Sequence, residues 1–325
     1  MMNARLVAAA VTSAVALGAG AAMAQDAADW PQGDLNYILH VNPGGATDVM
    51  ARRLADGLQR DLGVNVVVEN QPGGSGARQM ALMSMAEPDG QTLGSVTASH
   101  LGMFLQNEEF DVDSAEWACG LVLDPFLLAV SADSDIHSLD DLVEMAQENP
   151  GQMSIAGFGE ASGGHVGWAM FEEAAGIEGD INWVPYDSVG DAVTAALGGH
   201  NDIAIAYVGL VRQHVEAGNM RVIGIQSDER SEAFPDAPTY GEAGYDVDTT
   251  WAQFRGTIMP AGTPIELQEA LCDAVEAVLL TDEMQQYIAD SELVYGYMAP
   301  AEFREFVEAQ AEAAAYWAER LESIE

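Results

Sequence analysis

The sequence predicts an α/β protein built from two units, each a parallel or mixed sheet flanked by helices, with a central cleft between them. Three observations support this prediction. Strands and helices alternate up to about residue 225, glycine-rich turns follow several of the strands, and the chain ends in a mostly helical tail. Alternation of this kind is typical of parallel sheets. The chain has 325 residues, 49% of them hydrophobic, which is enough for two cores.

The first unit opens with a strand over Tyr37–Val41, a glycine turn, and a helix in which Thr47 or Asp48 is expected to be the N-cap. Residues 64–69 are rich in valine and predict a strand buried on both faces. The remaining expected elements are a helix at 77–86, a strand at 92–96, a loop at 111–117 and an apolar run at 121–130 that is interrupted at Asp124-Pro125.

The second unit repeats this pattern. Its expected helices are 138–148, 165–171, 191–197 and 211–216, and its expected strands are 153–156, 182–185, 202–207 and 221–225. The tail offers one strand, 250–259, and helices at 265–280, 282–291 and 300–321. A single strand has no sheet of its own, so we expect the tail to complete the first unit. The predicted domains are 25–124 with 251–325, and 125–250.

Charge is the most unusual feature of the composition. The net charge is -41, and all eleven basic residues are arginines. Such a surface repels nucleic acid and anionic membranes, so neither is an expected partner. The acidic residues are scattered, and we interpret them as an adaptation to a salty exterior, where ~1 M salt shortens the screening length to roughly 3 Å. A cation-binding acidic surface is the alternative, but no cluster of ligands supports it.

Residues 1–24 have the pattern of a signal peptide. Arg5 precedes an apolar run of small residues, and Ala22-Met23-Ala24 fits the cleavage rule, which predicts a secreted or periplasmic protein cleaved after Ala24. The run is too short for a stable membrane span. Cys119 and Cys272 can form one bridge in an oxidising compartment, but spacing alone does not establish it. We interpret them as two free buried thiols.

Catalytic and metal-binding motifs are scarce. The six histidines show no zinc spacing, and there is no Walker loop or dinucleotide fingerprint, so no metal or cofactor is expected. Ser162 with His165 is the one nucleophile–base pair close in sequence, which leaves a secreted α/β hydrolase as an alternative function. Helix capping by Ser162 and a polar pocket role for His165 explain the same residues more simply.

Three glycine turns, at 44–45, 73–74 and 157–164, each precede a helix, whose N-terminal N–H groups favour an anion. For the first of these turns, an ordinary capped turn without a ligand explains the residues about as well. If a ligand is clamped from both units, the turns over Pro43–Asp48 and Phe158–His165 are the natural pair. The candidate site residues, including polar ones at strand ends, are Pro43, Gly44, Gly45, Ala46, Thr47, Asp48, Thr97, Ser99, Phe158, Ser162, Gly163, Gly164, His165, Tyr186, Asp187 and Tyr207.

Several short motifs resemble the solute receptors of tripartite tricarboxylate transporters, the Bug family. They run in family order from about residue 36 to about 310, and together they are specific although each alone is weak. They are Asn42–Asp48 with Ala51-Arg52, Val68–Gly74, Pro88–Leu93, Val184–Tyr186 with Gly198-Gly199, Phe234–Thr239, and Phe254–Gly256 with Pro260–Pro264.

The resemblance implies a two-lobed, type II-like, non-enzymatic periplasmic binding protein that closes on a small organic acid such as a di- or tricarboxylate. It implies delivery to a membrane permease, and we expect a monomer. A sensor subunit that presents its ligand to a signalling protein is a further alternative. By family pattern, the first glycine turn and the turn before His165 hold the ligand carboxylate. The chain departs from the pattern at Gly164, where threonine is common, and at Asp187, where lysine is common. Arg78 and Arg255 are the basic residues that could compensate.

Overall fold

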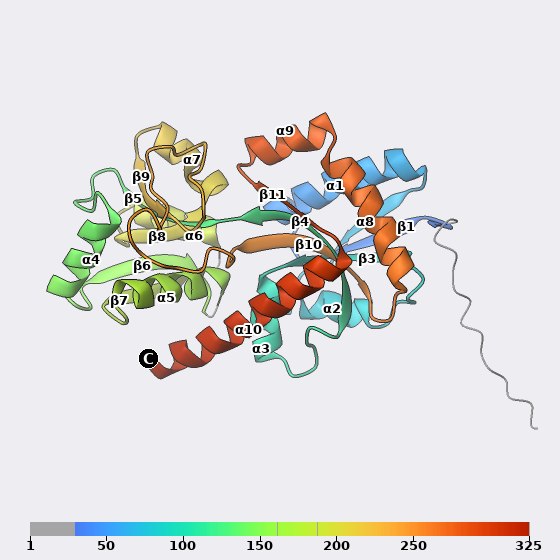
Figure 1. Cartoon of the computed structure of the whole chain (residues 1–325), viewed down its shortest axis with the longest axis horizontal. Helices are drawn as coiled ribbons and strands as arrows, with labels where there is room; N and C mark the ends of the chain where they lie inside the picture. Colours follow the sequence, from blue (N-terminus) through green and yellow to red (C-terminus); the bar gives the residue numbers. More distant parts are fainter. Residues whose placement is uncertain (1–29, 161, 187, 325) are drawn as a thin grey trace, which may run out of the picture.

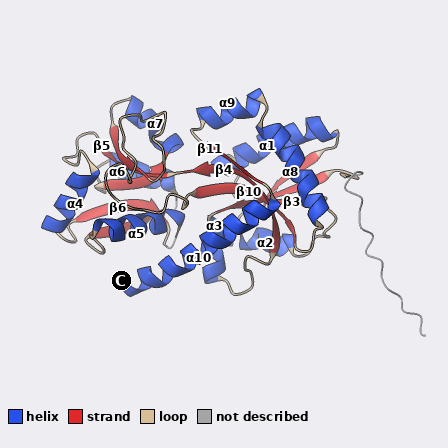
Figure 2. Ribbon diagram, viewed as in Figure 1, coloured by secondary structure: helices blue, strands red, loops and turns tan. Residues whose placement is uncertain are grey.

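The computed structural model describes residues 30–160, 162–186 and 188–324, and it forms two lobes, each with its own mixed sheet. Figure 1 shows the lobes side by side along the long axis, with the strands β4 (Ala115–Asp124) and β10 (Gln253–Pro260) between them. Helices lie on both sides of the strands of each lobe (Figure 2). The predicted signal peptide lies outside the described residues.

The sheet of the first lobe has six strands in the order β11-β4-β10-β3-β1-β2. Strand β1 pairs in parallel with β2 and β3, whereas β10 is antiparallel to β3 and β4. The strands not yet bounded are β1 (Leu35–Leu39), β2 (Val66–Asn70), β3 (Thr92–Thr97) and β11 (Val294–Met298). The tail therefore supplies two strands to this sheet, β10 and β11, of which the sequence predicted only the first.

Strand β2 lies at the edge of this sheet, and its residues alternate between partly buried and exposed. The prediction of a strand buried on both faces is therefore wrong. Val67 is 48% exposed, because an edge strand with helices on one face leaves its other face to solvent. A run of valines records a preference for extended backbone, but it does not locate the strand within the sheet.

The helices of the first lobe come from both ends of the chain. They are α1 (Ala46–Leu62), the short 3₁₀ turn η2 (Gly74–Gly76), α2 (Ala77–Met83), α3 (Ser99–Gln106), α8 (Ile265–Leu279), α9 (Asp282–Asp290) and α10 (Pro300–Ile324). Helix α3 was not predicted, and β4 begins at Ala115, inside the segment expected to be a loop. Helix α10 packs on β4, α3 and the second-lobe helix α5 (Gly163–Ala175), so the end of the chain contacts both lobes.

The second lobe has five strands in the order β7-β6-β8-β5-β9. The central pairs, β6 with β7 and β6 with β8, are parallel, whereas β5 is antiparallel to β8 and β9. The strands are β5 (Phe126–Ser131), β6 (Met153–Phe158), β7 (Ile181–Tyr186), β8 (Ile203–Tyr207) and β9 (Met220–Ile225). The further helices are α4 (Leu139–Glu148), α6 (Val189–Leu197) and α7 (Val208–Glu216). These elements match the sequence prediction closely.

The chain passes between the two sheets twice. Pro125 alone separates β4 of the first sheet from β5 of the second, and residues 226–252 lead from β9 back to β10. Among the helices of the described residues, none is both long enough and apolar enough to span a membrane.

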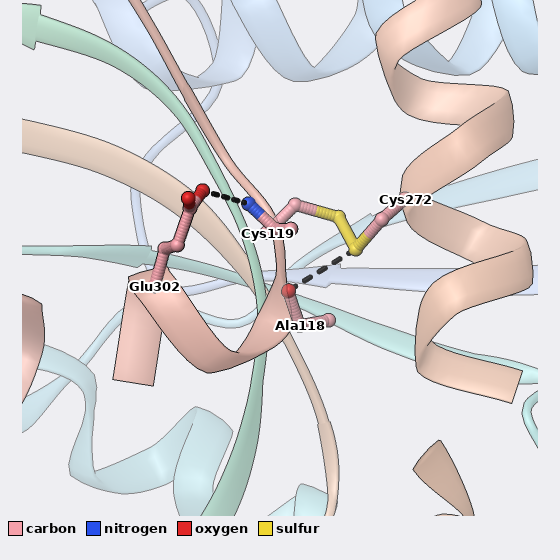
Figure 3. The surroundings of a disulfide bond; sticks show 5 residues. Ala118, Cys119, Cys272 and Glu302 are labelled. Atoms are coloured by element: carbon pink, nitrogen blue, oxygen red, sulfur yellow. Dashed lines mark hydrogen bonds between the residues drawn. A yellow bond between two sulfur atoms is a disulfide. The ribbon is translucent and has the colours of Figure 1, made fainter. Parts of the chain in front are cut away.

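Cys119 and Cys272 form a disulfide, which corrects the interpretation of two free thiols. Cys119 lies in β4 and Cys272 in α8, and their Cα atoms are 5.7 Å apart (Figure 3). Both side chains lie in the first-lobe core, where α8 packs on β4. The two residues are 153 positions apart, and only the packing of the tail helix on the first sheet brings them together.

Candidate functional site

A small pocket of about 70 Å³ lies where the two lobes meet. A space of this size holds a few water-sized groups. From the first lobe, Ser75 of η2 and residues 98–106 around α3 line it, and from the second lobe it is lined by the strand ends and the first turns of α5 and α6. Six of the predicted site residues lie in its wall, namely Ser99, Phe158, Ser162, Gly163, Gly164 and Tyr207.

The N-termini of three helices converge on this pocket, because Ser99 of α3, Gly163 and Gly164 of α5, and Val189 of α6 all line it. The first N–H groups of a helix have no acceptor within the helix, and the helix dipole makes that end positive. Three such ends around one small space favour a ligand with negatively charged or hydrogen-bond-accepting atoms.

Ser162 is the N-cap of α5, as predicted. Its hydroxyl accepts a hydrogen bond from the backbone N–H of His165 at 3.2 Å. A capping hydroxyl satisfies one N–H of the first turn, and the two glycines that begin the helix, Gly163 and Gly164, lie in the pocket wall. A Cβ placed on Gly163 would lie 3.2 Å from Cζ of Phe126 and 3.7 Å from Cβ of Ala98, so this end of α5 approaches both lobes closely.

His165 does not line the pocket; it is buried behind it. Its ring stacks on Trp183 with centroids 4.2 Å apart, and its Nδ1 lies 3.4 Å from a carboxylate oxygen of Glu160. Burial lowers the pKa of His165 to about 4, so the ring is neutral near pH 7. The Ser162 hydroxyl caps a helix, and the hydrolase alternative loses its nucleophile–base pair.

The first glycine turn differs from its prediction. Gly45, not Thr47 or Asp48, is the N-cap of α1, and Asp48 lies buried in the first helical turn. The Asp48 carboxylate accepts hydrogen bonds from Gly44 N at 2.9 Å, Asn70 Nδ2 at 2.8 Å and Arg52 Nε at 3.0 Å. Burial would raise the pKa of Asp48, but these hydrogen bonds and the charge of Arg52 outweigh it and lower the pKa to about 2. An internal carboxylate therefore already uses donors of this turn. Its residues Pro43, Gly44, Gly45, Ala46, Thr47 and Asp48 are not among those that line the pocket.

The remaining predicted residues lie in different places. Thr97 is buried beneath Ser99, with its Oγ1 2.8 Å from Ser99 Oγ. Tyr186 donates its hydroxyl hydrogen to Asn201 Oδ1 at 2.7 Å and does not line the pocket. Asp187 lies outside the described residues. Tyr207 lines the pocket beside Phe126, with ring centroids 5.4 Å apart, and burial raises the pKa of its phenol above the ordinary value.

Sequence reasoning missed several wall residues. Ser75 follows the second glycine turn, which was noted only as an anion-friendly geometry, and Phe126 follows the predicted crossing at Pro125. Gln106 and Gly102 lie on α3, which was not predicted. Gln253, at the start of β10, carries no sequence signal of its own.

Among the described residues, the pocket wall contains no cationic side chain and one carboxylate, that of Glu160. Arg255 is buried in β10, where one of its guanidinium nitrogens lies 3.1 Å from a carboxylate oxygen of Asp124. Arg78 is exposed. The described part of the chain has no cluster of three or more side chains able to hold a metal ion.

Comparison with known proteins supplies the family. The profile of the tripartite tricarboxylate transporter family receptors matches residues 50–319. The chain belongs to this receptor family. It is 30% identical over 301 residues to the "UPF0065 protein in gbd 5'region" of Cupriavidus necator, covering 92% of this chain and 90% of that protein. It is 33% identical over 232 residues to protein BugT of Bordetella pertussis, covering 70% and 71% respectively.

Solved structures have the same two-lobed fold. A TctC solute-binding protein from Polaromonas superposes with a TM-score of 0.77 at 22% identity, covering 90% of this chain and 99% of that one. MatC from Rhodopseudomonas palustris, solved with bound malate, gives 0.73 at 21% identity over 89% and 100%. The receptor is thus a periplasmic solute-binding protein of the Bug type, and its family consists of substrate-binding receptors rather than enzymes.

Proposed function

We propose that this receptor binds a small organic acid, a di- or tricarboxylate or a related carboxylate, in the pocket between its lobes. The convergence of the α3, α5 and α6 N-termini on that pocket is the observation that supports this most strongly. It offers oriented N–H and hydroxyl donors to an anion, and the described residues of the wall include no cationic side chain. Structural neighbours from Rhodopseudomonas palustris were solved with malate and with adipate, which are acids of this class.

The ligand contacts follow from the placement of the candidate residues. Hydrogen-bonding groups are offered by Ser99, Ser162, Gly163, Gly164 and Tyr207. Phe158 offers an apolar surface. We propose that Thr97 and His165 support this wall from behind. The Pro43–Asp48 turn and Tyr186 remain candidates for contact in a different degree of closure, and so does Asp187.

Binding is proposed to close the lobes about two crossing segments, Asp124-Pro125 and residues 226–252. The predicted domains, 25–124 with 251–325 and 125–250, are then the moving bodies. Arg320 of α10 pairs with Glu178 of the second lobe at 2.6 Å, and Gln310 donates to Thr250 O at 3.0 Å, so α10 links the two bodies. We further propose that a signal peptide is removed after Ala24, and that a monomer then delivers its ligand to a membrane permease.

A thermal-shift screen of organic acids in 1 M salt, followed by calorimetry, tests this proposal. An acid at 100 times its Kd should stabilise the protein by about 2.7 kcal/mol. We expect one equivalent of at least one di- or tricarboxylate to bind without being consumed. Stabilisation by neutral solutes alone, or turnover of the acid, would contradict the proposal.

A further inference from the structure

A chain of buried hydrogen bonds runs from the first-lobe core to the pocket wall. His40 Nδ1 lies 2.9 Å from Ser95 Oγ, and His40 Nε2 lies 3.2 Å from Thr97 Oγ1. Thr97 Oγ1 in turn lies 2.8 Å from Oγ of Ser99, a residue of the pocket wall. His40, Ser95 and Thr97 are all buried, so each of their polar hydrogens needs an acceptor inside the protein.

Ser95 fixes the direction of these hydrogen bonds. Within the described residues, its hydroxyl has two neighbours at hydrogen-bonding distance, the backbone N–H and Nδ1 of His40. The N–H is a donor, so the Ser95 hydrogen can be accepted only by Nδ1. His40 must then be the tautomer that carries its hydrogen on Nε2. Burial lowers the pKa of His40 well below its ordinary value, with a further lowering from His100, so the ring is neutral.

The second histidine is fixed independently. Gln79 Nε2 donates to the carbonyl oxygens of Ile38 and Ser95 at 2.7 and 2.8 Å, which leaves Gln79 Oε1 as an acceptor. His100 Nε2, 2.9 Å from that oxygen, is therefore the donor. Burial lowers the pKa of His100 to about 4, so this ring is also neutral. Neither histidine adds a charge to the pocket, and both serve to orient their neighbours.

The remaining steps follow from counting hydrogens. His40 Nε2–H donates to Thr97 Oγ1, which also accepts from Ser99 N at 3.3 Å. Both lone pairs of Thr97 are then used, and its own hydrogen goes to Ser99 Oγ. Ser99 accepts this bond and keeps its hydrogen for the pocket. We propose that Ser99 is a specificity-determining donor of the pocket, and that His40 and Thr97 are positioning residues that commit its hydrogen to the ligand.

This proposal rests on the proposed function and sharpens it. A Ser99 hydroxyl with a fixed donor direction selects ligands that present an acceptor oxygen there, such as an ionised carboxylate, over ligands that present an N–H or O–H donor. If these hydrogen bonds had the opposite direction, Ser99 would donate to Thr97 and offer the ligand only an acceptor. A carboxylate oxygen at that point would then be repelled rather than bound.

The tautomer of His40 can be measured directly and without a ligand. The mature receptor, with its histidines labelled with ¹⁵N, is studied by two-bond nitrogen–proton correlation near pH 7, and the His40 signals are assigned with the His40→Gln variant. We expect hydrogen on Nε2 and a bare Nδ1. Hydrogen on Nδ1 would reverse the direction of the hydrogen bonds from His40 to Ser99, and it would overturn the proposal whatever the receptor binds.

A double-mutant cycle tests the consequence for binding, with malate and adipate as probes measured by calorimetry in 1 M salt. Ser99→Ala should weaken binding about tenfold or more, since it removes a hydrogen bond to a charged group. Thr97→Val should weaken binding several-fold in the native background and have no further effect in the Ser99→Ala background. Equal effects of Thr97→Val in both backgrounds would mean a merely structural role and would overturn the proposal.

Thr257→Val is the matched control. Thr257 is a buried threonine of the adjacent strand β10 that does not line the pocket and does not take part in the hydrogen bonds from His40 to Ser99. It should change affinity less than twofold; a loss as large as that of Thr97→Val would count against the positioning role. If neither acid nor any other carboxylate of the screen binds, the proposed function fails and the donor role of Ser99 fails with it. The tautomer then still shows whether the chain has the direction inferred here.

Discussion

The two lobes each begin a helix at a glycine turn, but the electrostatic states of these turns differ. In the first lobe, the buried carboxylate of Asp48 accepts from Gly44 N and pairs with Arg52, so the turn already holds an anion of its own. In the second lobe, the neutral hydroxyl of Ser162 caps α5, and Gly163 and Gly164 lie at the pocket wall. An acidic side chain that already accepts a hydrogen bond from such a turn competes with an external anion for the same N–H groups.

The lobes also differ in how they are braced. A disulfide joins β4 to α8 in the first lobe, tying the N-terminal and C-terminal parts of the chain together. The described residues of the second lobe contain no cysteine, so no disulfide braces them. The first lobe is therefore the more rigid reference body on which we expect the second lobe to move.

Removing the disulfide should have the largest effect. A bridge across 153 residues restricts the unfolded chain, and by the chain-entropy account its loss costs roughly 2–5 kcal/mol. We expect the double variant Cys119→Ser with Cys272→Ser to lower the free energy of unfolding, measured from the first transition in urea, by that amount. Ligand affinity should stay nearly unchanged, because neither residue lines the pocket. Unchanged stability would show that the two lobes are braced alike. Wild-type protein with and without reductant provides the control.

Adding a methyl group at the glycine turn before α5 should have the next largest effect, and it should act on binding. Gly163→Ala places a methyl group 3.2 Å from Phe126 in a pocket of about 70 Å³, and we expect affinity for the best acid to fall about tenfold, which is about 1.4 kcal/mol. Gly45→Ala is the matched change in the first turn, where the added Cβ lies 3.8 Å from Asn42 O. It should alter affinity less than twofold. Calorimetry measures both affinities. A larger loss for Gly45→Ala than for Gly163→Ala would mean that the first turn, rather than the turn before α5, holds the ligand carboxylate.

Asp48→Asn tests the internal anion of the first turn. The folded pKa of about 2 lies below the ordinary value of 3.8, so the Asp48 carboxylate stabilises the protein above about pH 4, and this contribution is lost as the pH falls towards 2. Arg52 is half exposed, so after discounting for solvent we expect a loss of about 1–2 kcal/mol at pH 7. Near pH 2 the variant and the wild type should converge. A difference in urea midpoints that persists at low pH would point to packing instead of charge.

Much of the fold could be predicted from the sequence, because its signals are local. Ser162 caps its helix as expected, and the alternation of strands in the second lobe follows the apolar pattern. Elements with weak local signals were missed. Helix α3 is short, and β11 lies at the sheet edge and is held by its pairing with β4. The position of β2 at the opposite edge depends on a strand order that no local pattern encodes.

The candidate site was predicted in part, and for a similar reason. Turn glycines and the serines beside them are visible in the sequence, and those of α5 do line the pocket. Whether a turn is open to a ligand depends on contacts such as Asp48 with Asn70, which are 22 residues apart. The disulfide and the chain from His40 to Ser99 likewise depend on tertiary packing, so spacing could not reveal them.

Salt should have a smaller effect, and it distinguishes the repulsion of the whole chain from the electrostatics of the pocket. The pocket donors are neutral dipoles, while the whole chain carries a net charge of -41 that repels a carboxylate. Between 0.1 and 1 M salt the screening length falls from about 10 to about 3 Å, so we expect association rate and affinity each to rise several-fold. Stopped-flow and calorimetric titrations measure both.

Glu160→Gln measures the local repulsion of a bound acid, because Glu160 supplies the one carboxylate of the described pocket wall. The variant should bind an acid about twofold more tightly than wild type at 0.1 M salt, and the two should be equal at 1 M, since its side chain is 54% exposed and well screened. A steady loss of affinity with salt would mean that attraction dominates at the pocket. In that case a cation such as the buried Arg255, rather than the neutral turn of α5, would be the group that holds the ligand.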